Sequence, residues 1–239
     1  MKRSIMSREF LDRIKEDGYQ RGFPFVTISR EAGAGGHTLA EAIRKETSAF
    51  NFKELFRKWL VFDEAICTAV IKDPDLHVTI EELIAEAYNG PIVDFFHELV
   101  GKQSSHYTVA NRTFEFIKNI CSFGKVIVVG RAGSCVTQDL PGGIHVRLTA
   151  SLDNRIQHMA QLLSLEPDEA RRLIHKQDKD RSRLVRDFFN RRIQDAGLYT
   201  YVWDTDETPI DRIAREMIPL IERKQEQLKE TATPSSSEY

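Results

Sequence analysis

A glycine-rich turn joins a short apolar run to an amphipathic segment in residues 26–40, which read VTISREAGAGGHTLA. Because Gly33, Gly35 and Gly36 have no Cβ atom, successive backbone N–H groups can point into one concavity there, and a following helix adds the positive end of its dipole. This order predicts a strand, an anion-binding loop and a helix, as at the start of an α/β domain. The alternative is an ordinary strand-to-helix turn whose glycines serve tight packing.

The loop departs from the Walker pattern GxxxxGK[ST], because Gly36 stands at the lysine position and His37 follows it. Thr38 lies in the first turn of the predicted helix, where a hydroxyl can reach a magnesium ion shared with nucleotide phosphates. His37 can hydrogen-bond a phosphate or add charge when protonated, although a solvent-facing residue at a helix start has the same pattern. We predict a degenerate phosphate loop with Thr38 as the metal ligand, formed by Gly33, Ala34, Gly35, Gly36, His37 and Thr38.

The overall composition is that of a globular protein. The chain has 239 residues, 41% of them hydrophobic and 29% charged, and its net charge of −2 argues against general attraction to nucleic acid or anionic membranes. Cys67, Cys121 and Cys135 are widely separated and form no CxxC pair, which indicates free thiols in a reducing compartment. The charged N-terminus and the lack of an apolar run of ~20 residues favour a cytoplasmic protein with no membrane segment.

Short apolar runs alternate with helical patterns along the chain. We predict strands at 23–29, 59–63, 125–130, 144–149 and 198–204, with helices between them and a last helix at 208–229. Strands separated by helices pair in parallel, and their ligands bind beyond the carboxyl ends of the strands. Residues 1–22 are predicted to be a helical extension with its helix at 7–20, and 230–239 have the composition of a disordered tail.

Two arginine-containing segments fall where that geometry places a ligand. Arg131 directly follows the run KVIVVG and is flanked by glycines that let a ligand approach closely, which favours a planar fork for a phosphate. The alternative is a surface salt bridge. Residues 171–192 hold seven arginines and two lysines against three aspartates. This segment is either a solvated helix face or a mobile lid over phosphates, in which Lys176, Asp180 and Arg183 share one face.

The ordered set ISREAGAGG, FDEAI, VIVVGRAG, RLTASLDNRI, DKDRSR and VWDTD resembles the cytidylate kinase-like family of P-loop nucleoside monophosphate kinases. The resemblance implies a three-layer α/β fold of the P-loop NTPase type, with a parallel sheet, helices on both faces and a helical lid. The resemblance covers about residues 23–222. The predicted domain is 23–229, with a helical acceptor-binding insertion at about 64–122 and an arginine-rich lid at about 165–195.

The resemblance also implies roles for particular residues. Catalytic groups would be Arg30, Arg131, Lys176, Arg181 and Arg183, with Arg30 standing in for the Walker lysine. Arg155 matches the family's helix that precedes the lid. The acceptor would be bound by Asp63, Arg131, Asp180 and Arg183. Authentic cytidylate kinases have Asp where this chain has Ala132, and they have an arginine that is missing after Asp63, so the resemblance leaves the acceptor's identity open.

These observations predict transfer of a phosphoryl group from ATP, with Mg²⁺, to a small acceptor, most simply a nucleoside monophosphate. Small-molecule nucleotides would then be the partners, and the oligomeric state is left open. The missing lysine and the altered acceptor motif also fit a second class, a non-catalytic nucleotide-binding or regulatory module on the same fold. A third class, nucleic-acid binding through residues 171–192, is disfavoured because few aromatic side chains there could stack on bases.

Overall fold

The computed structural model describes residues 22–64, 67 and 106–232. The predicted helix at 7–20, most of the predicted insertion at 64–122 and all but the first residues of the predicted tail lie outside the described residues. Among the helices that the structure describes, each falls short of the length and apolar character needed to cross a bilayer.

Five parallel strands form one sheet in the order β2-β3-β1-β4-β5. β1 (Phe25–Arg30) lies at the centre between β3 (Val126–Val129) and β4 (Gly143–Thr149), and the edge strands are β2 (Leu60–Phe62) and β5 (Tyr201–Asp204). Ile28 of β1 is in register with Val129 of β3 and Val146 of β4, so the carboxyl ends of the three strands meet at one edge. The predicted parallel α/β sheet is confirmed.

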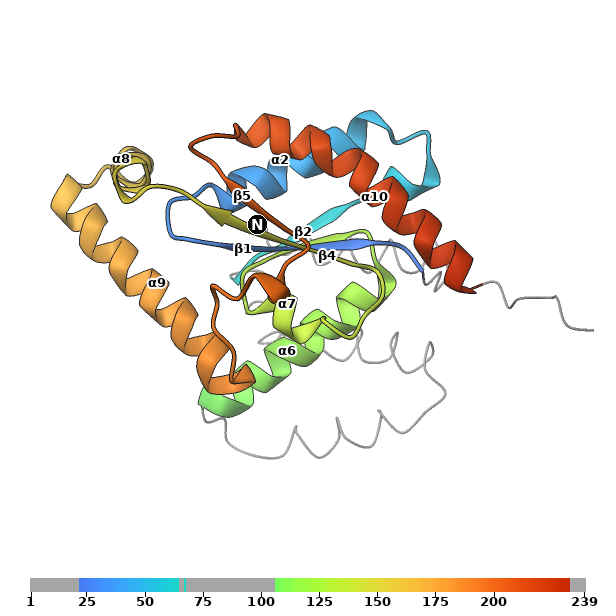
Figure 1. Cartoon of the computed structure of the whole chain (residues 1–239), viewed down its shortest axis with the longest axis horizontal. Coiled ribbons are helices and arrows are strands. Elements are labelled where there is room, and N and C mark those ends of the chain that lie inside the picture. The colour runs from blue at the N-terminus through green and yellow to red at the C-terminus, as the bar shows by residue number, and fades with distance from the viewer. Residues whose placement is uncertain (1–21, 65–66, 68–105, 233–239) are drawn as a thin grey trace, which may run out of the picture.

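Helices cover both faces of this sheet, as Figure 1 shows. α2 (Gly36–Ala49) and α10 (Ile210–Ala232) share one apolar cluster with the sheet, in which Leu39 and Met217 are fully buried. α6 (His106–Phe123) and the short α7 (Gly133–Val136) cover the opposite face, where Ile117 is fully buried. The fold therefore has the three predicted layers.

α8 (Leu152–Leu163) and α9 (Pro167–Phe189) form a hairpin at the edge where β1 and β4 end (Figure 1). Ser151 caps α8 by accepting the N–H of Asn154, and α9 starts with a capping box and a proline in its first turn. The far end of α9 returns to α6, where Phe188 and Phe189 pack their rings against Phe114. One long helix thus crosses the carboxyl edge of the sheet.

Several element boundaries differ from the sequence prediction. Within the predicted lid at about 165–195, α9 ends at Phe189, because Asn190 adopts a left-handed conformation with φ 49°. The predicted strand at 198–204 begins only at Tyr201, since the Asp195 side chain accepts the N–H of Gly197 and holds the short 3₁₀ helix η2 (Ala196–Leu198) ahead of it. A second such turn, η1 (Glu54–Phe56), precedes β2. At the other end of the domain, α10 runs on to Ala232, into the predicted tail.

Candidate functional site

The loop between β1 and α2 leaves the sheet at its central strand. Gly33 and Gly35 have φ 88° and 84°, a left-handed conformation that favours glycine, and the Leu39 N–H makes an early helical hydrogen bond to the Gly35 carbonyl. Within α2 as described, no acidic residue occupies the first turn and no side chain caps the helix. The N–H groups and the dipole at this end of α2 therefore remain available to an anion.

Arg30 ends β1 and folds its side chain across the start of α2. A Cβ atom at Gly36 would lie 2.9 Å from Cγ of Arg30, and one at Gly130 would collide with Nη1 of the same arginine. The stem of Arg30 thus passes through the space where a side chain at position 36 would begin. Burial, together with the cations Arg181 and Arg131, lowers the pKa of Arg30. A bound anion would therefore stabilise the charged form of this side chain.

Arg131 follows β3 in a strained turn. Arg131 and Ala132 have φ 55° and 54°, both left-handed, and this conformation places Arg131 beside the Arg30 side chain. Its guanidinium forms an ion pair with Glu64, directly after Asp63, and burial lowers its pKa. Asp63 also lies 3.7 Å from Nε2 of His37, measured to Oδ2. Two predicted acceptor residues, Asp63 and Arg131, therefore lie near the loop.

The third arginine comes from α9. Arg181 donates to Asp178 at 3.3 Å and to Gln177 at 3.0 Å, and burial lowers its pKa. Arg30, Arg131 and Arg181 all line one cavity of ≈ 30 Å³, which lies between α9 and the ends of β1 and β3. The arrangement concentrates positive charge beside the loop in a small, partly buried space.

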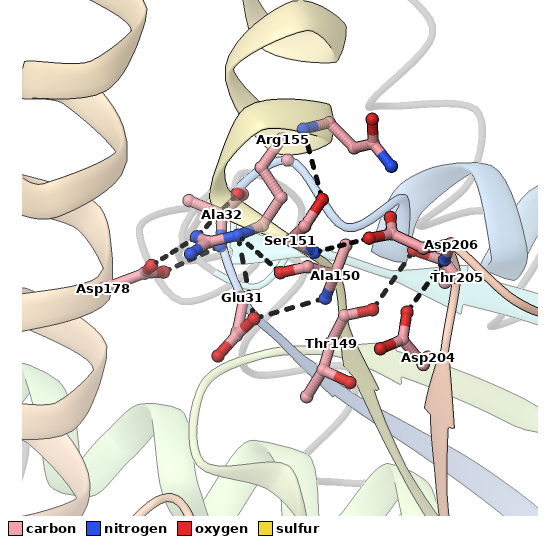
Figure 2. A network of polar contacts seen from close by, with 12 residues as sticks. Glu31, Ala32, Thr149, Ala150, Ser151, Arg155, Asp178, Asp204, Thr205 and Asp206 are labelled. Atoms are coloured by element: carbon pink, nitrogen blue, oxygen red, sulfur yellow. Dashed lines mark hydrogen bonds and ion pairs between the residues drawn. The ribbon is translucent and has the colours of Figure 1, made fainter.

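α8 and α9 are fastened to the loop by the polar network in Figure 2. The Ala32 N–H donates to Oδ1 of Asp178 at 2.7 Å, and Arg155 donates to Oδ2 of Asp178 at 2.8 Å. Arg155 also donates to the carbonyl oxygens of Ala32 and Ala150. Glu31 accepts the N–H of Ala150, which adds a second carboxylate to the network. These contacts hold the start of the loop, the start of α8 and the middle of α9 together.

A larger cavity of ≈ 440 Å³ opens on the other side of the loop. The loop contributes Gly33, Ala34, Gly35 and Thr38, and α8 contributes polar side chains that include Gln157 and His158. Nδ1 of His158 lies 2.6 Å from the Gly33 carbonyl oxygen, so this face of α8 is in direct contact with the loop. Thr38 is exposed in the first turn of α2, where its hydroxyl can offer magnesium the oxygen ligand that this ion prefers.

The structure separates the residues predicted for the lid. Arg181 lies at the site, whereas Lys176, Asp180 and Arg183 are exposed and line neither cavity. The acidic residue that reaches the loop is Asp178, which the sequence reasoning missed.

A second missed residue is Arg147, which is buried in β4 and donates to the Ser29 hydroxyl at 3.3 Å. An arginine inside the otherwise apolar strand GIHVRLT was the available signal for it.

Comparison with known proteins places these features in context. The sequence model of the cytidylate kinase-like family matches residues 25–207, and no curated protein matches the chain. The solved structure of an uncharacterized protein from Eubacterium ventriosum is similar with a TM-score of 0.61 at 17% identity, over 84% of this chain and 98% of that one. This likeness shows the fold.

Two kinases of known structure are more distant. A gluconokinase from Sinorhizobium meliloti has a TM-score of 0.44 at 14% identity, over 90% of this chain and all of its own. A shikimate kinase from Bacteroides thetaiotaomicron has a TM-score of 0.39 at 15% identity, over 87% of this chain and 97% of its own.

Proposed function

The chain belongs to the cytidylate kinase-like family, and from that premise we propose that it transfers the γ-phosphoryl group of ATP to a nucleoside monophosphate in the presence of Mg²⁺. The family supports phosphoryl transfer in general, and the nucleotide acceptor is the finer part of the proposal. In the reaction an oxygen of the acceptor's phosphate bonds to the γ-phosphorus, the bond to the β–γ bridging oxygen breaks, and ADP leaves.

The donor is assigned to the loop and the larger cavity. Backbone N–H groups of residues 33–38 would hold the β- and γ-phosphates, and Thr38 would be a ligand of the magnesium ion that shields them. The cavity of ≈ 440 Å³ beside the loop has the size of a small-molecule site, and its carboxamide side chains, such as Gln157, can hydrogen-bond the edge of a base.

Arg30 takes the part of the Walker lysine in this proposal. The Walker pattern has glycine in its first position and lysine in its seventh, whereas this loop has Arg30 first and Gly36 seventh. The contact between the Arg30 stem and the space above Gly36 supports the idea that the cation reaches the phosphates from the opposite end of the loop.

The acceptor is assigned to the side of Arg131 and Asp63. Arg131 would bind the acceptor's phosphate in exchange for its ion pair with Glu64, and Arg181 would neutralise charge on the group in transfer. No general base is required, since the attacking phosphate is already an anion. The protein's contribution is therefore positioning, charge neutralisation and exclusion of water.

The convergence of Arg30, Arg131 and Arg181 on one cavity at the mouth of the loop carries the proposal. We would test it by measuring ADP release from ATP and Mg²⁺ with CMP, UMP, dCMP, AMP and GMP in turn, alongside calorimetric titration of ATP. ADP release that depends on one of these acceptors, and that falls in Arg131→Ala with a higher KM, would support it. Binding of ATP without acceptor-dependent ADP release would instead favour a non-catalytic nucleotide-binding module.

A further inference from the structure

We propose that Asp178 is a latch, a carboxylate on α9 that closes this helix onto the loop by occupying an anion position for which a nucleotide phosphate competes. The proposal deepens the function proposed above, because it concerns the regulation of the same site. It assigns a role to a residue that lies on the lid helix but outside the set of basic residues expected to act there.

The contacts of Asp178 are those of a bound anion. Its carboxylate accepts a backbone N–H from the loop, at Ala32, and guanidinium N–H groups from Arg155 and Arg181, with donor–acceptor distances between 2.7 and 3.3 Å. One backbone amide and two arginines are also the donors that recognise a phosphate oxygen in many proteins. The carboxylate therefore occupies a position in which a phosphoryl group could accept the N–H groups of Ala32 and Arg155.

The burial of these groups gives the latch its strength. The side chains of Arg155 and Arg181 are only 11% and 25% exposed, and that of Asp178 is 31% exposed, so their attraction is screened less than that of a surface pair. Arg155 and the Ala32 N–H would lose this carboxylate if α9 moved away, whereas Arg181 lies on α9 and would move with it. A phosphate that arrives in its place restores the charge pairing of Arg155.

The size of the cavity beneath α9 explains why a latch matters. With α9 against the loop, the three arginines share a narrow cavity of ≈ 30 Å³. Movement of α9 away from the loop would widen the access of an acceptor phosphate to Arg131. Asp178 is the side chain that joins α9 to the loop backbone, so its release is the step that couples phosphate binding to this movement.

The first test is the affinity of the full chain for pyrophosphate, measured by calorimetry in the wild type, Asp178→Asn and Asp187→Asn. Asp187 is exposed on the same helix, so its variant removes the same charge from α9 without touching the loop. We expect Asp178→Asn to bind about tenfold more tightly than both other proteins, because one charged competitor is gone. Equal or weaker binding by Asp178→Asn would overturn the latch.

A second test uses the wild-type latch and does not depend on how well Asp178→Asn folds. Spin labels on cysteines at Lys45 of α2 and Arg172 of α9, both exposed, report the distance between these helices once Cys135 is replaced by alanine. Pyrophosphate should broaden or lengthen this distance in the protein with Asp178. An unchanged distance with pyrophosphate bound overturns the latch and leaves the proposed kinase reaction standing. Failure of every variant to bind pyrophosphate or ATP would instead refute the phosphate site itself.

Discussion

At the scale of single residues, the loop has its cation and its glycine in exchanged places relative to the Walker pattern. Arg30 occupies the position of the first glycine and Gly36 that of the lysine. The exchange is coupled, since a Cβ atom at Gly36 would lie only 2.9 Å from Cγ of Arg30. A side chain at position 36 would therefore collide with the arginine at position 30, so the loop can carry one of them but not both.

This coupling predicts the behaviour of a swap. Arg30→Gly should weaken ATP binding about tenfold or more, since a hydrogen bond to a charged group contributes about 1.5–3 kcal/mol. Gly36→Lys alone should be worse than the wild type, because the new side chain meets Arg30. The double variant Arg30→Gly/Gly36→Lys should recover most of the affinity, because lysine then reaches the phosphates as in a Walker loop. Calorimetric titration of the four proteins measures this, and a double variant no better than either single one contradicts it.

At this scale, the sequence predicted the features that depend on the residue types of a short segment alone. Glycines at left-handed positions marked the loop, and the glycine next to Arg131 marked the turn after β3. Asp178 was not predictable in this way, since the pattern grouped Asp180 with the basic residues of α9. Which side of a helix faces the loop depends on how α9 crosses the sheet edge, and that is decided by its ends packing on α8 and α6.

At the scale of elements, the loop and α8 are in contact through backbone as well as side chains. Gly33 lies against the first turn of α8, and a Cβ atom there would be 2.8 Å from the carbonyl oxygen of Arg155. The glycine is thus required by its φ of 88° and by the close approach of the helix. The placement of the lid hairpin therefore depends on a residue of the loop.

Gly33→Ala should reduce the free energy of unfolding by about 2–4 kcal/mol, since a left-handed alanine costs about 1–2 kcal/mol and an overpacked contact about 1–3. Gly22→Ala is the matched control, because Gly22 has φ 99° but nothing within 4 Å of an added Cβ atom. We expect about 1 kcal/mol there. Urea denaturation of both variants gives the comparison, and equal losses would show that α8 yields to the new methyl group.

The elements themselves were largely predictable from hydrophobic pattern. β-branched runs such as VIVV identified the buried strands, because strands covered on both faces need apolar side chains throughout. The start of β5 was not predictable, since Leu198, Tyr199 and Thr200 are residue types that suit a strand. The backbone is turned there because the Asp195 side chain accepts the N–H of Gly197. A single side-chain contact there decides between an extended and a turned backbone.

At the scale of the whole molecule, the last helix completes the core although it lies beyond the family match at residues 25–207. α10 packs on α2 and contributes Ile213, Met217 and Ile221, all fully buried, to the larger apolar cluster. The face of the sheet next to the loop therefore depends on residues that the family pattern does not include. We expect the domain to lose its stability if α10 is weakened.

Met217→Ala tests this dependence. Met217 is fully buried, so its truncation should lower the free energy of unfolding by about 2–5 kcal/mol, the range for large-to-small changes in a core. Arg215→Ala, an exposed position two residues earlier, should change it by less than about 0.5 kcal/mol. Chemical denaturation compares the two, and a small loss at Met217 would mean that α10 is not integral to the fold.

The absence of lysine from residues 30–38, REAGAGGHT, has a practical consequence. Nucleotide reagents that acylate an amine beside the phosphates find no such nucleophile in this loop, where the neighbouring cation is the guanidinium of Arg30. A survey of nucleotide-binding proteins that relies on such amine-reactive reagents would not label a phosphate loop without lysine. Dicarbonyl reagents directed at arginine, with and without ATP as a protectant, are the labelling chemistry suited to them.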